Sequence, residues 1–217
     1  MDKLTTKSYW ENRYLQGGNS GYGSYGQEAA MKATMINHWI KEFDIKTIQE
    51  IGCGDGNNLL MYNVRMQYTG YDISPKAIEL CRLKTKNIRN TLMYYFTTEL
   101  KDIDYDADLC LCLDVWFHQL EEKDFQDLCT LLFVTGKWKY IICYTTDSNS
   151  QLMPDGTPMA SHMFQREFLS KVQEYSQWEI IYWISGIQVN ESQNIQFPSD
   201  KRFYLLRRKI PLQVPKE

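Results

Sequence analysis

The stretch Glu50-Ile51-Gly52-Cys53-Gly54-Asp55-Gly56 (EIGCGDG) decides the fold of this chain. It follows the short apolar segment 47–51, a predicted strand, and precedes the predicted helix 57–63. Glycines at alternate positions let the backbone turn sharply and leave room for a flat, polar ligand to approach it. Because ligands of open parallel sheets bind beyond the carboxyl ends of the strands, the stretch predicts a binding pocket at this turn.

Strand-like and helix-like segments alternate around this turn. The expected strands are 47–51, 67–71, 91–96, 108–113 and 138–144, and the expected helices are 27–44, 57–63, 74–84 and 121–133. The third of these helices begins at Ser74-Pro75, a capping residue followed by proline at the first helical position. Such alternation predicts an α/β fold with a mostly parallel sheet and helices on both of its faces.

The end of the chain breaks this alternation. A helix is expected near 165–175, and two strands are expected at 178–185 and 202–208. The polar stretch between these strands supplies no helix, so they are predicted to pair antiparallel. No repeat or linker divides the chain, which indicates one domain over residues 1–217.

Two segments outside the regular pattern are expected to be loops. The N-terminal arm, residues 1–26, is dense in aromatic residues and glycine, which favours a structured loop over a helix. The polar segment 145–163 contains two prolines and follows the fifth predicted strand. Its position places it at the same sheet edge as the glycine turn, where we expect a substrate loop.

Composition narrows the class of protein. The net charge of -3 over 217 residues gives no general field for a phosphate polymer, which argues against a nucleic-acid-binding module. No apolar run approaches the roughly 18 residues of a membrane span, and the N-terminus lacks a secretory signal pattern. A cytoplasmic protein with no membrane partner is expected. The six cysteines fall mostly in apolar stretches and are interpreted as reduced core residues.

A carboxylate is predicted beside the glycine turn. Asp72 ends the second predicted strand, 20 residues after Gly52, where it can accept hydrogen bonds from both hydroxyls of a ribose. The dinucleotide fingerprint requires a third glycine where this chain has Asn57, a departure that weakens the case for a nicotinamide-dependent oxidoreductase. Together these residues indicate a nucleoside cofactor without a pyrophosphate.

The segments EIGCGDG (50–56), GYDIS (70–74) and RFYLLRR (202–208) occur in this order over nearly the whole chain, which resembles a class I S-adenosylmethionine-dependent methyltransferase. The resemblance implies a Rossmann-like, seven-stranded sheet in the order 3-2-1-4-5-7-6 with strand 7 antiparallel. It implies S-adenosylmethionine as the cofactor and S-adenosylhomocysteine as the product.

The resemblance also assigns cofactor contacts. The residues concerned are Gly52 and Gly54 at the amino-acid end, Glu50 to orient that end, Asp72 at the ribose and Ile73 against adenine. The arm is similar to a lid over the cofactor, with candidates Trp10, Arg13 and Tyr25. Many family members carry an acid just after the third strand to bind the adenine amino group. This chain has Thr97 and Thr98 there, and either hydroxyl is a candidate for that contact.

The segment after the fourth predicted strand, DVWFH (114–118), occupies the place where the family positions residues facing the transferred methyl group. His118 is the candidate general base, because its ordinary pKa suits proton removal near neutral pH. Asp114 is a candidate to orient His118 or the substrate, and Trp116 is a candidate substrate contact. A purely structural role for His118 is equally compatible with the sequence.

The loop after the fifth strand supplies a second set of candidates. His162 is the alternative base, and Arg166 is a candidate for binding an anionic group of the substrate by a bidentate contact. A helix capped by Ser161 with a solvated Arg166 explains the same residues. No metal is expected, because Phe117 stands where metal-binding relatives have glutamate.

The predicted function is methyl transfer to an oxygen or nitrogen of a small molecule or sugar-like metabolite. One alternative is methylation of RNA or of a protein side chain, for which the basic clusters 82–89 and 201–209 are the only support. Another is a non-catalytic S-adenosylmethionine-binding partner subunit. The sequence leaves the acceptor, the methylated atom and the oligomeric state open.

Overall fold

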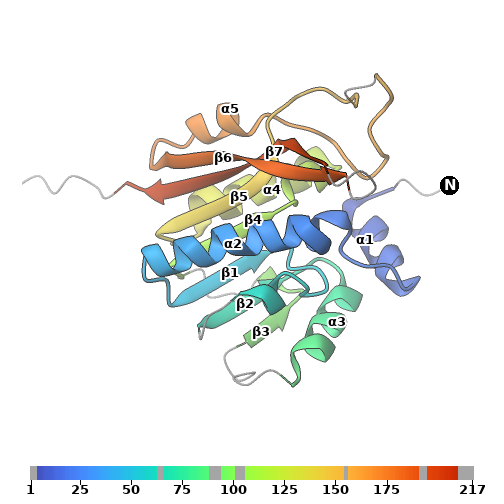
Figure 1. Cartoon of the computed structure of the whole chain (residues 1–217), viewed down its shortest axis with the longest axis horizontal. Helices are drawn as coiled ribbons and strands as arrows, with labels where there is room; N and C mark the ends of the chain where they lie inside the picture. Colours follow the sequence, from blue (N-terminus) through green and yellow to red (C-terminus); the bar gives the residue numbers. More distant parts are fainter. Residues whose placement is uncertain are drawn as a thin grey trace, which may run out of the picture.

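The sheet of the computed structural model has the predicted order, β3-β2-β1-β4-β5-β7-β6 (Figure 1). The structure describes residues 4–62, 66–87, 94–100, 106–153, 156–190 and 195–209. All neighbouring strands pair parallel from β3 to β5, whereas β7 runs antiparallel to both β5 and β6. The seven-stranded, Rossmann-like fold expected from the family resemblance is therefore confirmed.

Five strands match their predicted positions closely, and the last two are longer than expected. The strands are β1 (Thr47–Ile51), β2 (Gln67–Tyr71), β3 (Tyr94–Thr97), β4 (Leu109–Leu113), β5 (Tyr140–Thr146), β6 (Trp178–Asn190) and β7 (Ile195–Arg208). Residues 91–93 of the predicted third strand lie outside the described residues. The described parts of the polar stretch expected to separate the last two strands, residues 186–190 and 195–200, instead extend both of them.

Alternation along the central strands fills a separate core on each face of the sheet. In β4, Leu109, Leu111 and Leu113 pack against helix α2 (Gly26–Glu42) and helix α3 (Pro75–Thr85). Cys110 and Cys112 pack on the opposite face, against helix α4 (Glu122–Thr130) and helix α5 (Phe168–Gln173). A strand that is covered on both faces must be apolar at every position, which explains the LCLCL sequence.

Four predicted helices form close to their expected positions, and one does not. Ser74 caps α3 by accepting a hydrogen bond from the Ala77 N–H, with Pro75 as the first helical residue. The predicted helix 57–63 is wrong over its described part, where only the 3-10 turn Leu59–Met61 forms. This turn ends at Tyr62, whose backbone is extended (φ −78°, ψ 121°) and cannot continue a helix.

The expectation that the N-terminal arm is a loop is also wrong. Residues Thr6–Leu15 form helix α1, followed by the short turn Tyr22–Ser24. Thr5 and Ser8 form a reciprocal capping box at the start of α1. Glu11 fixes the helix to the rest of the protein by accepting hydrogen bonds from the hydroxyl of Ser74 and the backbone N–H of Lys76. Capping and tertiary contacts thus decide the conformation of a segment with little amphipathic pattern.

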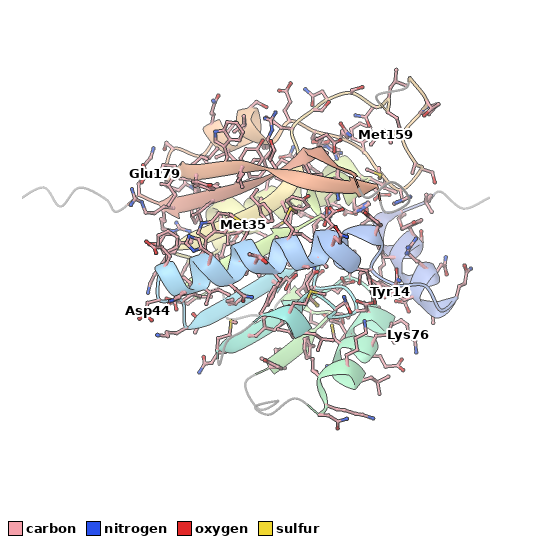
Figure 2. The ribbon with its side chains drawn as sticks, viewed as in Figure 1. Tyr14, Met35, Asp44, Lys76, Met159 and Glu179 are labelled. Carbon is pink, nitrogen blue, oxygen red and sulfur yellow. The ribbon has the colours of Figure 1, made fainter. Side chains whose placement is uncertain are left out.

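The arm lies at the carboxyl end of the parallel strands. In Figure 1, α1 and α3 lie together at one end of the sheet. Figure 2 shows Tyr14 and Lys76 at this end, with Asp44 at the opposite end, where the chain enters β1. None of the described helices has the length and apolar character needed to cross a membrane.

Candidate functional site

A pocket lies at the carboxyl ends of β1, β2 and β4. Its walls come from α1 and the segment after it, the glycine turn, the end of β2, the segment after β4, and α4. Of the residues predicted from the sequence, seven lie in the wall. They are Trp10, Gly52, Gly54, Asp72, Ile73, Asp114 and His118, joined by Val115 of the DVWFH segment.

The glycine turn cannot carry side chains at its central positions. Gly52 and Gly54 have φ values of 76° and 56°, a region that L-residues rarely adopt. A Cβ on Gly52 would lie 2.2 Å from Cγ2 of Val115, and one on Gly54 would lie 2.3 Å from Oγ of Ser20. The turn is tied to β2 because the backbone N–H groups of Gly52 and Cys53 both donate to the carbonyl of Tyr71.

Asp72 connects the end of β2 with the glycine turn. Its carboxylate accepts hydrogen bonds from the backbone N–H groups of Gly54 and Ser74, each at 2.9 Å. Burial raises the pKa of Asp72 to about 6, in opposition to those two hydrogen bonds. Each carboxylate oxygen has a second lone pair, so Asp72 can still accept hydrogen bonds from a ligand.

Glu50 lies beneath the turn and outside the pocket wall. Its side chain is buried and accepts a hydrogen bond of 2.6 Å from the hydroxyl of Tyr68. Burial raises the pKa of Glu50 to about 7, although the Tyr68 hydrogen bond and the charge of Lys32 act in the opposite direction. The direct cofactor contact predicted for Glu50 is therefore not among the contacts of the described pocket.

The arm contributes a different set of residues from the one predicted. Trp10 lies in the pocket wall together with Tyr14 and Ser20, which the sequence analysis missed. Arg13 lies outside the wall, where its Nε donates to the Asn19 carbonyl and its guanidinium lies over the Trp10 ring. Arg13 therefore stabilises the arm in this structure.

Tyr25 also lies outside the wall, at the junction between the arm and the glycine turn. Its hydroxyl donates to the carboxylate of Asp55 and accepts a hydrogen bond of 2.9 Å from Nζ of Lys84. Lys84 in turn pairs with Asp55 at 3.0 Å. The three side chains fasten the arm to the turn.

Thr97 and Thr98 are not part of the pocket wall. Thr97 is buried, and its Oγ1 accepts a hydrogen bond of 2.9 Å from the Glu99 N–H. The wall near the end of β3 is formed instead by Leu100. Leu128 and Leu131 add further apolar surface to the wall from α4 and the turn that follows it.

Asp114 is the centre of a buried charge network. It has a φ of 59°, unusual for a non-glycine residue, and its carboxylate pairs with Lys32 at 2.7 Å and Lys201 at 2.9 Å. Lys201 also pairs with Glu28 at 2.6 Å. Burial alone would raise the pKa of Asp114, but the charges of Lys201 and Lys32 outweigh it and lower the pKa below its usual range. Asp114 is therefore ionised and charge-compensated.

His118 and His162 lie together at one side of the pocket. Their rings stack with centroids 5.3 Å apart, and His162 stacks on Tyr9 at 4.3 Å. Nδ1 of His118 is 2.8 Å from the His162 carbonyl oxygen, which can only accept, so Nδ1 carries the proton and Nε2 keeps its lone pair. Burial lowers the pKa of His118 to about 4, which makes the imidazole neutral at pH 7.

The two predicted substrate contacts lie in the protein interior. Trp116 is completely buried among aromatic side chains, and its Nε1 donates to the Arg166 carbonyl. The Arg166 guanidinium donates to the Gln119 carbonyl at 2.7 Å and pairs with Glu122 at 3.3 Å. Neither residue lines the described pocket, and the internal contacts of Arg166 leave it no bidentate face for an anionic substrate.

Sequence reasoning missed Lys32 and Lys201 because they are far from Asp114 along the chain and belong to no motif. Their only signal was a lysine on the predicted apolar face of a helix and another at the edge of a strand. Among the described residues, no group of three or more His, Cys, Asp or Glu side chains is arranged to hold a metal ion.

Comparisons with known proteins agree with this geometry. Residues 48–135 match the family model of a methyltransferase domain. A search of curated proteins finds no match.

Three solved structures illustrate the shared fold. The methyltransferase domain of bacterial CtHen1 has 16% identity and a TM-score of 0.60, covering 83% of this chain and 98% of its own. Magnesium protoporphyrin IX methyltransferase from Synechocystis PCC 6803, with bound S-adenosylmethionine, has 14% identity and a TM-score of 0.64, covering 96% and 100%. The mitomycin 7-O-methyltransferase MmcR has 13% identity and a TM-score of 0.60, covering 85% and 55%.

At these identities the structures show the fold alone, whereas the family model matches the segment that contains the glycine turn, Asp72 and His118. The resemblance seen in the sequence is thereby confirmed. The chain has the fold of the class I S-adenosylmethionine-dependent methyltransferases, and its residues 48–135 match the model of a methyltransferase domain.

Proposed function

We propose that this protein binds S-adenosylmethionine in the pocket and transfers its methyl group to an oxygen or nitrogen atom of a small molecule. The observation that carries the proposal is the convergence of the glycine turn, Asp72 and the arm at the carboxyl ends of β1, β2 and β4. This is the position where open parallel sheets bind their ligands.

The residues of the pocket fit an adenosine carrying an amino-acid chain. Asp72 is an acceptor for the ribose hydroxyls, and Ile73 and Leu100 supply apolar surface for a base. Gly52 and Gly54 themselves line the pocket, and a side chain at either position would collide with Val115 or Ser20. Trp10 lies in the wall, where an aromatic ring attracts a sulfonium cation.

When bound, the cofactor supplies a methyl group on a good leaving group, so the protein must mainly align and desolvate the acceptor. Nε2 of His118 is a neutral hydrogen-bond acceptor at one side of the pocket. With a pKa of about 4, His118 is too weak a base to deprotonate a free hydroxyl. It can orient an O–H or N–H group and take its proton as the methyl bond forms, because methylation makes that proton strongly acidic.

Three further features support a small acceptor. The arm, residues 1–26, contributes Trp10, Tyr14 and Ser20 to the pocket wall, which is the arrangement of a lid. The segment 145–163 brings His162 against His118 and Tyr9, as a substrate loop would. Two of the similar proteins are named as methyltransferases of magnesium protoporphyrin IX and of mitomycin.

We infer that residues 1–217 form one catalytic domain and that the protein works in the cytoplasm.

Calorimetric titration with S-adenosylhomocysteine tests the cofactor site. Asp72→Asn keeps the side-chain shape but replaces one acceptor oxygen with a donor, and we expect at least a tenfold loss of affinity from losing a hydrogen bond to a charged group. Asp44→Asn makes the same change at the opposite end of the sheet and should leave affinity unchanged (Figure 2). An absence of binding to the wild-type protein would refute the proposal.

A further inference from the structure

The side of the pocket that α4 shares with the segments after β2 and β3 combines apolar and polar residues in an arrangement suited to a base. Ile73, Leu100 and Leu128 are its apolar members. Its polar members are Gln119, Asp124 and Asp127, which belong to α4 and the segment leading into it. Because Ile73 directly follows the proposed ribose-binding Asp72, the base of a bound nucleoside would lie against this wall.

Two of the three polar residues are engaged elsewhere. Nε2 of Gln119 donates to the Val115 carbonyl at 3.2 Å. Asp127 is largely exposed and pairs with Lys123 across one helical turn. Asp124 is half-buried, unlike the exposed Asp127, and its carboxyl group interacts with that of the neighbouring Glu121.

A second carboxyl group stands beside Asp124. Burial raises the pKa of Asp124, and the neighbouring Glu121 carboxyl raises it further. Oε2 of Glu121 lies 3.4 Å from the backbone N–H of Thr6, whereas its Oε1 is buried without a hydrogen-bond partner among the described residues. Of the two carboxyl groups, that of Asp124 lines the pocket, and Glu121 supports it from outside the pocket wall.

We propose that Asp124, supported by Glu121, binds the exocyclic amino group of the adenine of the cofactor. This inference rests on the proposed function, since it places the base of that cofactor. The amino group carries two N–H donors and no acceptor, which matches what the carboxyl groups lack. The contact would come from α4, in place of the acid that the family positions after the third strand, where this chain has Thr97 and Thr98 outside the pocket wall.

A carboxylate at position 124 would also stabilise α4 without any ligand. It is in the first turn of α4, where a negative charge interacts favourably with the helix dipole. Glu122 is in the same turn and has the same charge, but it is exposed, lies outside the pocket wall and pairs with Arg166. Glu122→Gln therefore removes the dipole interaction without touching the pocket, which makes it the matched control for Asp124→Asn.

The test compares two ligands that differ only at the base. S-adenosylhomocysteine has an amino group at position 6, and S-inosylhomocysteine has a carbonyl oxygen there, which would face the acceptor atoms of Asp124. We expect the wild-type protein to bind the adenosine compound ten- to a hundredfold more tightly, about the range of one hydrogen bond to a charged group. In Asp124→Asn the ratio should fall to within about threefold, because an amide can either donate or accept. Glu122→Gln should keep the wild-type ratio.

The other possible results would overturn either this inference or the proposed function. An unchanged ratio in Asp124→Asn, or no preference in the wild-type protein, would overturn the inference. Loss of the ratio in Thr98→Val or Glu99→Gln would overturn it as well, by placing recognition after β3. In all of these cases the wild-type protein still binds S-adenosylhomocysteine. A wild-type protein that binds neither compound would instead refute the proposed function. Circular dichroism of each variant verifies that α4 remains folded.

Discussion

Replacing Glu50 with glutamine should make the protein more stable at alkaline pH and not at acidic pH. The side chain is fully buried, and burial raises its pKa to about 7 from an ordinary value of 4.5. Between these values the folded protein holds a proton on Glu50 that the unfolded chain has lost. The free energy of unfolding therefore falls as pH rises from about 4.5 to about 7, and this loss persists above pH 7.

The size of the effect follows from the two pKa values. One pKa unit corresponds to about 1.4 kcal/mol, so keeping an ionised Glu50 in the folded protein costs about 3 kcal/mol. Glu50→Gln has no proton to lose and retains an acceptor for the Tyr68 hydroxyl. The stability of the variant relative to wild type should therefore increase by about 3 kcal/mol between pH 4 and pH 8.

Urea unfolding of both proteins at a series of pH values measures this difference. Burying the extra amide N–H groups adds a penalty that does not depend on pH, so the change in the difference is the meaningful quantity. The control is Glu79→Gln, the same chemical change at an exposed carboxylate that pairs with Lys76. A stability difference for Glu50→Gln that stays constant from pH 4 to pH 8 would refute the reasoning.

Three further predictions concern His118 and Asp114, which both lie in the pocket wall. His118→Ala should lower turnover at least about tenfold while leaving the affinity for S-adenosylhomocysteine nearly unchanged, because His118 is proposed to contact the acceptor; equal turnover would remove it from the mechanism. Since the pKa of His118 is about 4, activity should not fall through its protonation between pH 8 and pH 5.5. Asp114→Asn should cost about 3–5 kcal/mol in urea unfolding, because it removes the anion that pairs with the buried Lys32, whereas Lys201 keeps Glu28. A loss below about 1 kcal/mol would show that the network is not important for stability.

The site was only partly predictable, and the reason differs between residues. Gly52, Gly54 and Asp72 belong to two short motifs at the ends of neighbouring parallel strands, and their positions follow once the sheet order is known. Arg166 shows the opposite case. Its place in the sequence indicated a substrate contact, but its guanidinium lies between the rings of Phe125 and Phe164 and pairs with Glu122.

The proposed adenine contact could not be predicted from the sequence either. The sequence placed its polar contact after β3 because the family does so, and it contained no pattern that would bring α4 to that position. Asp124 reaches the pocket only through the packing of α4 on the sheet, where Phe125 and Leu128 are buried. A relation of this kind depends on side chains from distant segments and has no local signature.

The sequence by itself determined the strand and helix pattern, the order of the sheet through its family motifs, and the glycine turn, because each depends on residues within a few positions of one another. The tertiary structure alone decided that the N-terminal arm forms a helix over the pocket, that Lys32 and Lys201 neutralise Asp114, and that Trp116 and Arg166 face inward. These outcomes depend on burial and on charges brought together from far apart in the chain, and burial sets the energy of a charge or hydrogen bond more strongly than residue identity does.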